Sequence, residues 1–245
     1  MTSYYKHLNQ GLTQAREQLI KEGQLFHPHN WQARTAQVGM VEVLNFSFAA
    51  QMPSTVDALV KDLEPDLPWS ELHFAERVSG YPLNPAPSYM VWPYYKHDEL
   101  WKVQGGKFSH TYPERFWTPH LEGVRYTYGN LGDLLNLLER DPTTRQAFLP
   151  MWFPEDTGAA HGERVPCTIG YHFQLRNNKL HMYYPMRSCD YRRHMKNDLY
   201  MATRMTQWLI EMLSERNSLW KDVTPGILQF NCYNLHIFEG EERVI

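Results

Sequence analysis

The sequence is poor in cysteine, with three among its 245 residues, at positions 167, 189 and 232. Three cysteines do not make a disulfide framework, and none of the spacings forms the C-x-x-C pair of a zinc site. We therefore expect no metal, and a reduced cytoplasmic setting, or the host cytoplasm if a phage carries the gene. Each thiol is free to be a small buried side chain or a nucleophile.

The sequence also lacks the apolar run of about 18 residues that a membrane-spanning helix requires. Residues 1–23 are polar and periodic, which is typical of an amphipathic helix and not of a signal peptide. Basic charge is not in excess, since 24 Lys and Arg stand against 27 Asp and Glu, for a net charge of −3. A polynucleotide partner normally requires a basic surface. We predict no membrane and no polynucleotide partner, although local cations could still hold a small anion.

Aromatic residues, by contrast, are abundant. The chain has 8 Trp and 15 Tyr, and 42% of its residues are hydrophobic. This length allows one large domain or two small ones, and the composition allows a sizeable core. The rings suit a deep pocket for a planar ligand, but they are equally common as core packing.

Hydrophobic periodicity indicates both helices and strands. It predicts helices over 4–22, 54–63, 68–78, 130–140 and 198–215, and strands over 37–50, 146–153, 168–175, 179–185 and 226–238. The stretch 81–119 is rich in proline and aromatic residues and has no clear period. Because helices and strands do not alternate regularly, we predict an α+β fold with a large mixed or mainly antiparallel sheet and flanking helices.

Cys167 follows Pro166 and opens a strand-like segment directly after a polar loop. A thiol at the mouth of a strand and near cations can have a lowered pKa and act as a nucleophile. A lone cysteine is more often a small buried apolar residue. Position alone leaves both interpretations open.

The segment MRSCDYRRHMKND, residues 186–198, concentrates cations, carboxyl groups and a thiol between a predicted hairpin and a predicted helix. Arg187 and Ser188 offer the donors that a phosphate group needs. Asp198 stands near the helix start, where a carboxylate is also a common first-turn residue. Four other residues could have a functional role, but each alone could also be an ordinary surface charge or a structural side chain: Arg34, Glu71, Arg145 and His236.

The order of these pieces resembles the thymidylate synthase family. Pro166-Cys167 is followed by a hairpin, by Arg187-Ser188 with Asp190 two residues on, by a helix start and by a histidine in a late strand. The matching segments are PCTIGYHFQLRNNKLHMYYPMRSCD, NDLYMA and NLHIF. Upstream, DPTTRQ resembles the family's phosphate motif, and SELHF is similar to the family helix that carries a catalytic glutamate.

This resemblance implies a single thymidylate synthase-like catalytic domain over residues 1–245, which forms a sheet-to-sheet homodimer. It also implies a pyrimidine nucleotide C5 one-carbon transferase with 5,10-methylenetetrahydrofolate as co-substrate. By that likeness, Cys167 attacks C6 of the ring and turns C5 into a nucleophile, which then takes the methylene group. Glu71 would move protons on the base or the folate.

The same likeness assigns the binding residues. The phosphate would be held by Arg34, Arg187, Ser188 and Arg145, and Arg145 would serve the partner's site across the dimer. His236 would lie near the sugar, Tyr112 would line the substrate pocket, and Asp190 and Trp92 would lie on the folate side.

Asp198 is the position that would select the base. The family's thymidylate synthases carry Asn there, whose amide matches the N3–H donor and O4 acceptor of uracil. Cytosine inverts both groups, and a carboxyl group that shares a proton with N3 fits that inverted pattern. Asp198 and Met186 both resemble the family's deoxycytidylate and cytidylate 5-hydroxymethylases. We therefore predict a CMP or dCMP 5-hydroxymethylase.

The sequence also departs from the family pattern. Gln146 replaces the second Arg of the phosphate motif, and Phe238 replaces a Tyr that would contact the sugar, so the ribose or deoxyribose preference stays open. The sequence ends soon after the last strand, whereas synthases have a tail over the folate, which we expect to favour addition of water. Three alternatives remain: a (d)CMP or dUMP 5-methyltransferase, a non-catalytic nucleotide-binding protein on this fold, and an unrelated α+β protein with chance matches.

Overall fold

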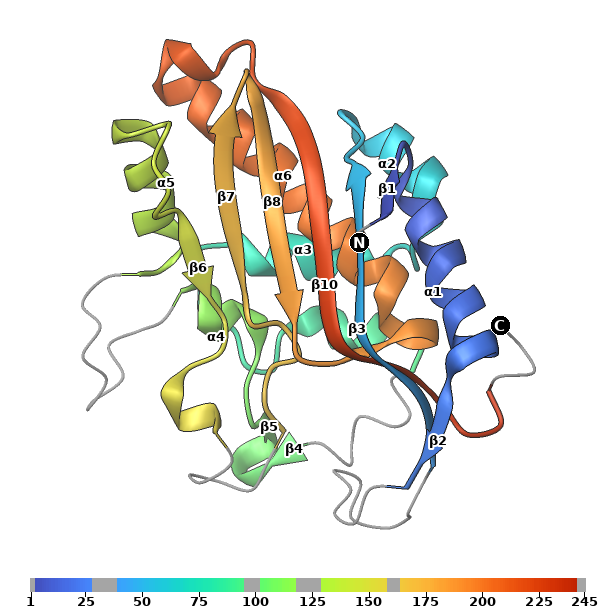
Figure 1. Cartoon of the computed structure of the whole chain (residues 1–245). Coiled ribbons are helices and arrows are strands. Elements are labelled where there is room, and N and C mark those ends of the chain that lie inside the picture. Colours follow the sequence, from blue (N-terminus) through green and yellow to red (C-terminus); the bar gives the residue numbers. More distant parts are fainter. Residues whose placement is uncertain (1–2, 28–38, 95–101, 118–128, 158–163, 242–245) are drawn as a thin grey trace.

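The computed structural model describes residues 3–27, 39–94, 102–117, 129–157 and 164–241. Eight strands of this part of the chain form one sheet, in the order β1-β3-β10-β8-β7-β6, with β2 paired to β3 and β9 paired to β10 (Figure 1). Their bounds are β1 Ser3–Tyr5, β2 Gln24–Phe26, β3 Met40–Gln51, β6 Phe148–Pro150, β7 Gly170–Arg176, β8 Lys179–Met186, β9 Cys189–Asp190 and β10 Thr224–Phe238.

The sheet is mixed, because β10 runs antiparallel to β3 but parallel to β8 and β9. The predicted α+β class is therefore confirmed. Each predicted strand is present with shifted ends, and the strand expected over 146–153 shortens to three residues. The short strands β1, β2 and β9 were not predicted.

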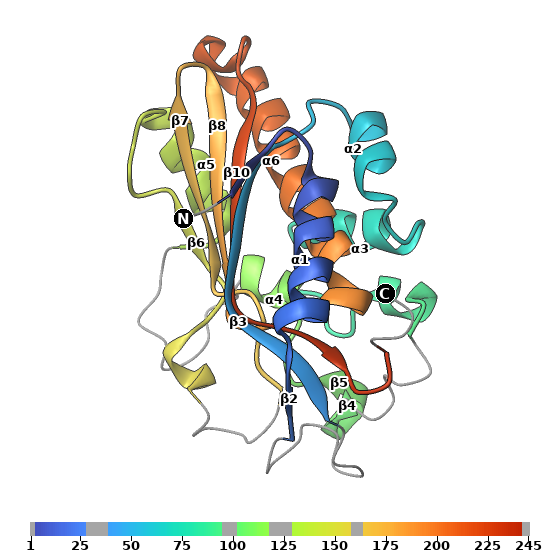
Figure 2. The ribbon, with the colours of Figure 1, turned by 45° about the vertical axis from the view of Figure 1, so that its right-hand side comes forward.

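Helices cover one side of this sheet, as Figure 2 shows for α1, α2, α3 and α6. The bounds of the helices are α1 Leu8–Glu22, α2 Val56–Leu63, α3 Trp69–Arg77, α4 Tyr112–Phe116, α5 Leu131–Arg140 and α6 Lys196–Arg216. The core lies between α6 and the inner face of the sheet, where Leu209, Tyr184 and Phe230 are fully buried. None of the helices in the described ranges is long and apolar enough to cross a membrane.

Local sequence signals explain where several elements begin and turn. Thr55 caps α2 by accepting a hydrogen bond from the backbone N–H of Ala58, and Asn130 begins α5 with a capping box. Asn177 and Asn178 connect β7 to β8 with φ angles of 50° and 55°. Both angles lie in the left-handed region that asparagine tolerates and that a two-residue hairpin turn needs.

The proline-rich stretch forms short elements instead of a long loop. Within 81–94 and 102–117, the chain makes a 3₁₀ turn at Pro87–Val91, the small hairpin of β4 (Lys102–Val103) and β5 (Lys107–Phe108), and helix α4. Thr111 and Glu114 begin α4 with a capping box. Such short elements have no extended period, which explains why the sequence pattern did not show them.

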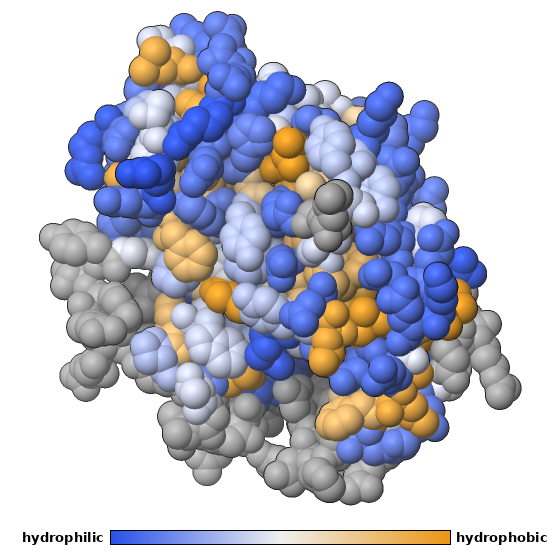
Figure 3. All heavy atoms as spheres, viewed as in Figure 1, coloured by the Kyte–Doolittle hydropathy of each residue, from blue (hydrophilic) through white to orange (hydrophobic). Residues whose placement is uncertain are grey.

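The outer face of the sheet is not covered by any helix of the described chain. Figure 3 views this face and shows apolar and polar residues intermixed over it. Its large exposed side chains include Phe148, Tyr183 and Tyr233, which are 43%, 39% and 48% exposed. These residues alternate with buried ones along β6, β8 and β10, as expected for strands with one face in the core.

Candidate active site

The segment between β8 and α6 brings several predicted site residues to one end of the sheet. Strand β9 pairs with the end of β10, which sets Asp190 beside His236. A π-helical turn, Tyr191–Met195, then leads into α6. The Asp190 carboxylate caps that turn by accepting the backbone N–H groups of Arg192 and Arg193 at 3.1 and 3.0 Å. The turn therefore sets the phase of α6, on which Asp198 is the third residue.

Cys167 lies at the mouth of β7, where Thr168 bridges to Met186. The backbone N–H of Arg187 donates to the carbonyl of Cys167 at 2.7 Å, and Nη2 of the same arginine lies 3.9 Å from the thiol Sγ. Burial raises the pKa of the Cys167 thiol, while the charges of Arg187 and Arg164 act in the opposite direction. The two arginines thus favour the reactive thiolate, although the effect of burial on the pKa is larger.

Asp198 is buried, with 8% of its surface exposed. Its Oδ2 accepts a weak hydrogen bond from the Cys189 thiol at 3.9 Å. Burial raises the pKa of Asp198 to about 7, an increase that the charge of Arg77 partly offsets. The charge of Asp198 in turn raises the pKa of Cys167, so the two predicted residues belong to one electrostatic site.

A chain of hydroxyl groups underlies this site. Arg77 is buried, and its Nη1 donates to the hydroxyl of Tyr171 at 3.3 Å while its guanidinium lies 4.0 Å from the ring centre of Tyr112. The hydroxyl of Tyr112 donates to Thr168 Oγ1 at 3.1 Å, which also bonds Tyr184 at 3.0 Å. These bonds hold Tyr112 against the residue that follows Cys167.

Ser188 and His236 also meet in the structure. Ser188 Oγ lies 3.3 Å from His236 Nδ1, and Asn234 Oδ1 lies 3.0 Å from the same nitrogen. Burial lowers the pKa of His236 to about 4, so the imidazole is neutral at pH 7. A neutral imidazole bound on one nitrogen can offer the other one to a sugar hydroxyl.

Next to this cluster lies a cavity of about 160 Å3 with aromatic walls. Trp92 stacks on His194, which the π-helical turn supplies, at 5.3 Å between ring centres, and Trp69 stacks on His73 at the same distance. The indole Nε1 of Trp92 is buried and has no hydrogen-bond partner among the residues that the structure describes. The lining of the cavity includes Trp69, His73, Trp92, Tyr112, Arg164 and His194.

Glu71 is not brought to this cluster. Its carboxylate accepts from Arg204 at 2.9 and 3.1 Å and from the Tyr200 hydroxyl at 2.6 Å, on the side of α3 that faces α6. Burial favours a raised pKa, but the hydrogen bonds from Arg204 and Tyr200 outweigh it and lower the pKa of Glu71. Its side chain is 41% exposed and absent from the cavity wall.

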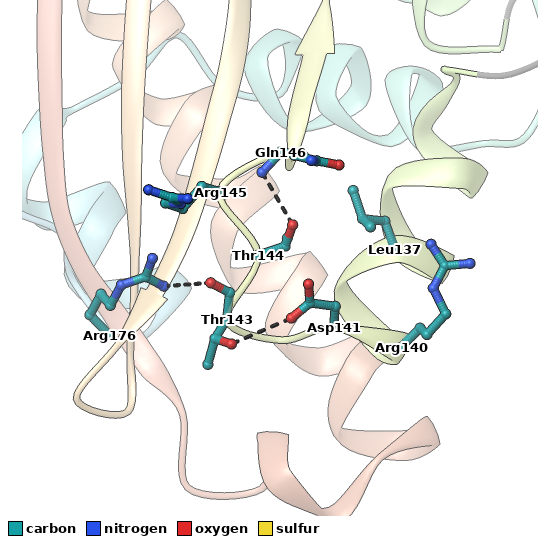
Figure 4. A pocket seen from close by; sticks show the side chains of 8 residues that line it. All are labelled: Leu137, Arg140, Asp141, Thr143, Thr144, Arg145, Gln146 and Arg176. Atoms are coloured by element: carbon teal, nitrogen blue, oxygen red, sulfur yellow. Dashed lines mark hydrogen bonds between the residues drawn. The ribbon is translucent and has the colours of Figure 1, made fainter.

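Arg145 lies apart from Cys167, in the loop between α5 and β6. Figure 4 shows it beside Gln146, with Arg140 and Arg176 around the same loop. These residues line an open depression of about 670 Å3, and Arg176 Nη1 donates to the carbonyl of Thr143 at 3.0 Å. An arginine here could reach a phosphate only in another molecule or on this surface. Arg34 lies outside the described residues.

Sequence reasoning missed four residues of this site: His73, Arg77, Arg164 and His194. Arg77 and Arg164 resemble ordinary surface charges in sequence, since their place in the site depends on how the chain folds. His73 and His194 did carry a signal. His73 lies four residues from Trp69, and His194 lies four residues from Asp190 and from Asp198, a spacing that places side chains on one face of a helix.

A known protein family and several known proteins have sequences similar to this chain. The sequence profile of the family described as thymidylate synthase matches residues 86–241. The proteins named "Putative thymidylate synthase" of Methanosarcina mazei and Methanosarcina acetivorans are each 24% identical over 137 residues, which is 55% of this chain and 55% of theirs. The chain thus spans about half the length of the curated relatives it matches.

The fold also matches a known structure. Thermostable thymidylate synthase A from Bacillus subtilis superposes with a TM-score of 0.67. The superposition covers 98% of this chain and 83% of that one, at 13% sequence identity. At that identity, the likeness shows a shared fold, in which a mixed sheet is packed against helices.

Proposed function

Because this chain belongs to the thymidylate synthase family, we propose that it transfers one carbon unit from 5,10-methylenetetrahydrofolate to C5 of a pyrimidine nucleotide. Members of the family are one-carbon transferases that use this folate as co-substrate. The activity we propose is that of a CMP or dCMP 5-hydroxymethylase, in which water adds to the transferred carbon. The catalytic domain would comprise residues 1–245, in a cytoplasmic protein with free thiols.

The carboxyl group of Asp198 is the observation that carries this proposal. It is buried, its charge acts on the Cys167 thiol, and its pKa of about 7 lets it share a proton near neutral pH. Cytosine presents an N3 acceptor next to an amino donor, and a protonated carboxyl group can complete both contacts. Uracil would leave two buried groups mismatched, at about 1–3 kcal/mol for each.

Cys167 would form the covalent bond to the nucleotide. Its thiolate adds to C6, which places an electron pair at C5, and C5 then attacks the methylene carbon of the folate. Arg187 stabilises the thiolate from 3.9 Å. It would also bind the phosphate together with Ser188 and Arg34, while His236, held by Ser188 and Asn234, would accept or donate at the sugar.

The binding role of Arg145 requires a homodimer. The uncovered outer face of the sheet supports such an assembly. Strand β6 lies at the edge of the sheet, and it begins at Phe148, three residues after Arg145. A second chain that packs on this face would therefore come close to Arg145. We propose that two chains pack sheet to sheet and that each Arg145 completes the phosphate site of the partner. Asp190 and Trp92 would face the folate.

One incubation tests the proposed activity. The protein is mixed with methylenetetrahydrofolate and with CMP, dCMP or dUMP, and the products are weighed by mass spectrometry. We expect a 5-hydroxymethyl product from CMP or dCMP and little reaction with dUMP. A nucleotide that binds but yields no product would favour a non-catalytic binding protein on this fold.

A second candidate is a 5-methyltransferase, which the names of the Methanosarcina relatives favour. In that reaction the folate supplies the hydride as well as the carbon, so dihydrofolate is released. The absorbance of dihydrofolate during turnover separates the two reactions. A stoichiometric rise with a methylated product would replace the hydroxymethylase proposal.

A further inference from the structure

Helix α3 turns a different residue towards the cavity than the sequence suggested. Trp69 and His73 are one helical turn apart and share a face, and both line the cavity. Glu71 lies between them on the opposite side, where it pairs with Arg204 of α6. The helix therefore presents an imidazole where a carboxylate was expected.

The His73 ring is held in one orientation. Its Nδ1 lies 3.1 Å from Ser88 Oγ and 3.5 Å from Glu76 Oε2, and the ring stacks on Trp69 with an interplanar angle of 15°. Glu76 also accepts from both the backbone N–H and the hydroxyl of Ser88. Glu76, Ser88 and His73 thus form a chain that ends at the cavity.

This chain determines which ring nitrogen carries the proton. Burial tends to raise the pKa of Glu76, but hydrogen bonds from His73 and Ser88 outweigh it and lower that pKa, so the carboxylate is ionised and only accepts. The single hydroxyl proton of Ser88 then points to Glu76. Ser88 Oγ must accept from His73, which places a proton on Nδ1 and leaves Nε2 bare.

Tyr112 connects the cavity wall that carries the bare nitrogen to the segment that carries the thiol. The His73 ring meets the edge of Tyr112 at 6.5 Å between centres, and the Tyr112 hydroxyl donates to Thr168, next to Cys167. Arg164 lines the cavity and also acts on the charge of Cys167. The side chain of His73 is 19% exposed, and no hydrogen bond to its Nε2 occurs among the described residues.

We propose that His73 Nε2 is the general base that takes a proton from the water molecule in the hydroxymethyl step, with Glu76 and Ser88 as its positioning residues. This inference rests on the proposed hydroxymethylase function and names the residue that activates its water. Burial, with a smaller contribution from the charge of Arg77, lowers the pKa of His73 to about 4, so the imidazole is neutral at pH 7 and keeps a lone pair on one ring nitrogen.

The step is balanced without any further reactant. The nucleotide carries an exocyclic methylene at C5 and Cys167 at C6 after the folate nitrogen has left. A lone pair of the water oxygen forms the C–O bond to the methylene carbon, and the π pair moves to C5. The water proton passes to His73 Nε2. The C5 pair then re-forms the C5–C6 double bond as the C6–Sγ bond breaks, and the thiolate leaves.

The test compares His73→Gln with Leu72→Gln, a matched change at an exposed position of the same helix. Removing a general base lowers a rate by about 10²–10⁴-fold. We expect His73→Gln to lose hydroxymethylation at least about 100-fold, while release of tritium from C5, which precedes the water step, still reaches about one equivalent per active site. Leu72→Gln should behave like the wild type.

A thiol added to the medium sharpens this comparison. 2-Mercaptoethanol at alkaline pH supplies a thiolate, which attacks the exocyclic methylene without a base. The His73→Gln protein should therefore form a 5-thioether nucleotide at a near wild-type rate, detectable by mass. Ser88→Ala should lower hydroxymethylation less and shift the ¹⁵N signals of His73 from the Nδ1–H tautomer towards a mixture.

Each outcome decides one of the two proposals. A wild-type protein that gives no hydroxymethyl product refutes the proposed function. An active wild type whose His73→Gln variant keeps hydroxymethylation within about threefold overturns the role of His73, because a lost base costs far more. Loss of tritium release together with product, without thioether formation, would also overturn it, since His73 would then act before the water step.

Discussion

At the scale of single residues, Asp198 has two effects: it would recognise the base, and its raised pKa lowers the stability of the folded chain. A carboxyl group with a pKa of about 7 in the folded chain binds more protons than in the unfolded chain, where the pKa is about 3.9. Stability therefore falls as the pH rises between these two values, and the deficit stays above pH 7. Such a deficit at a binding site is the usual stability cost of function.

Asp198→Asn should remove this deficit. We expect the variant to match the wild type at pH 4 and to be more stable by about 2–4 kcal/mol at pH 8, from about three pKa units at 1.36 kcal/mol each. Urea unfolding at both pH values measures the difference. A gain that is equal at pH 4 and pH 8 would contradict the assigned titration.

The same substitution should change the base preference. An amide at position 198 can match uracil but not share a proton with cytosine N3. We expect Asp198→Asn to lower kcat/KM for CMP or dCMP by about 100-fold or more relative to dUMP, since two mismatches cost about 1–3 kcal/mol each. Competition between the nucleotides measures this ratio, and an unchanged ratio would refute the role of Asp198.

The sequence predicted part of this residue-level picture. The order of the Pro-Cys and Arg-Ser-x-Asp segments allowed the family to be foreseen, because motif order carries over between related chains. The sequence did not predict which residues of α3 face the cavity. Glu71 and His73 are two residues apart, about 200° around a helix, and only packing against α6 decides which one faces the cavity.

At the scale of elements, α3 and α6 are joined by polar contacts outside the site. Asn197 is fully buried and bonds the backbone N–H of Asp66 at 2.9 Å and the hydroxyl of Ser70 at 2.8 Å. Glu71 and Arg204 join the same helices farther along. These contacts fix the angle at which α3 carries His73 and α6 carries Asp198.

Glu71→Gln therefore tests a structural role. The ion pair is partly exposed, so its loss should lower the free energy of unfolding by about 0.5–1.5 kcal/mol. That corresponds to a Tm lower by about 2–5 °C in a chain of this size. One-carbon transfer should stay within about threefold of the wild type, far from the loss of a catalytic acid. Calorimetry measures the Tm, and initial rates measure the transfer reaction. A large loss of rate with an unchanged Tm would show that Glu71 is catalytic.

Element boundaries show the limit of sequence periodicity. Helix α6 begins at Lys196, two residues before the predicted start, and the π-helical turn before it was not foreseen. A π-helical turn has no distinctive period, and it depends on Asp190 capping backbone groups across the turn. The long strands β3 and β10, by contrast, were predicted because their alternation extends over more than ten residues.

At the scale of the whole molecule, the order of strands could not be predicted from the sequence. Strand β10 lies between β3 and β8, which are separated by more than a hundred residues in the chain. Such pairing is set by the joint packing of both faces and not by any local pattern. The fold class was predictable because it needs only the mixture of elements.

The proposed dimer leads to a complementation test. Cys167→Ser chains and Arg145→Ala chains should each be inactive alone. In an equal mixture, half of the dimers are mixed and each has one intact site, so we expect about a quarter of the wild-type activity. Tyr183→Glu, on the outer face of the sheet, should abolish both this rescue and the dimer seen by analytical ultracentrifugation. Rescue without a dimer, or a dimer without rescue, would contradict the shared site.

The environment of the Cys167 thiol has a consequence for its reactivity towards small reagents. Peroxides and alkylating agents attack the thiolate, and desolvation, which raises the pKa of Cys167, keeps that form scarce. Chemical modification of Cys167 should therefore be slow at neutral pH and become faster as the pH rises.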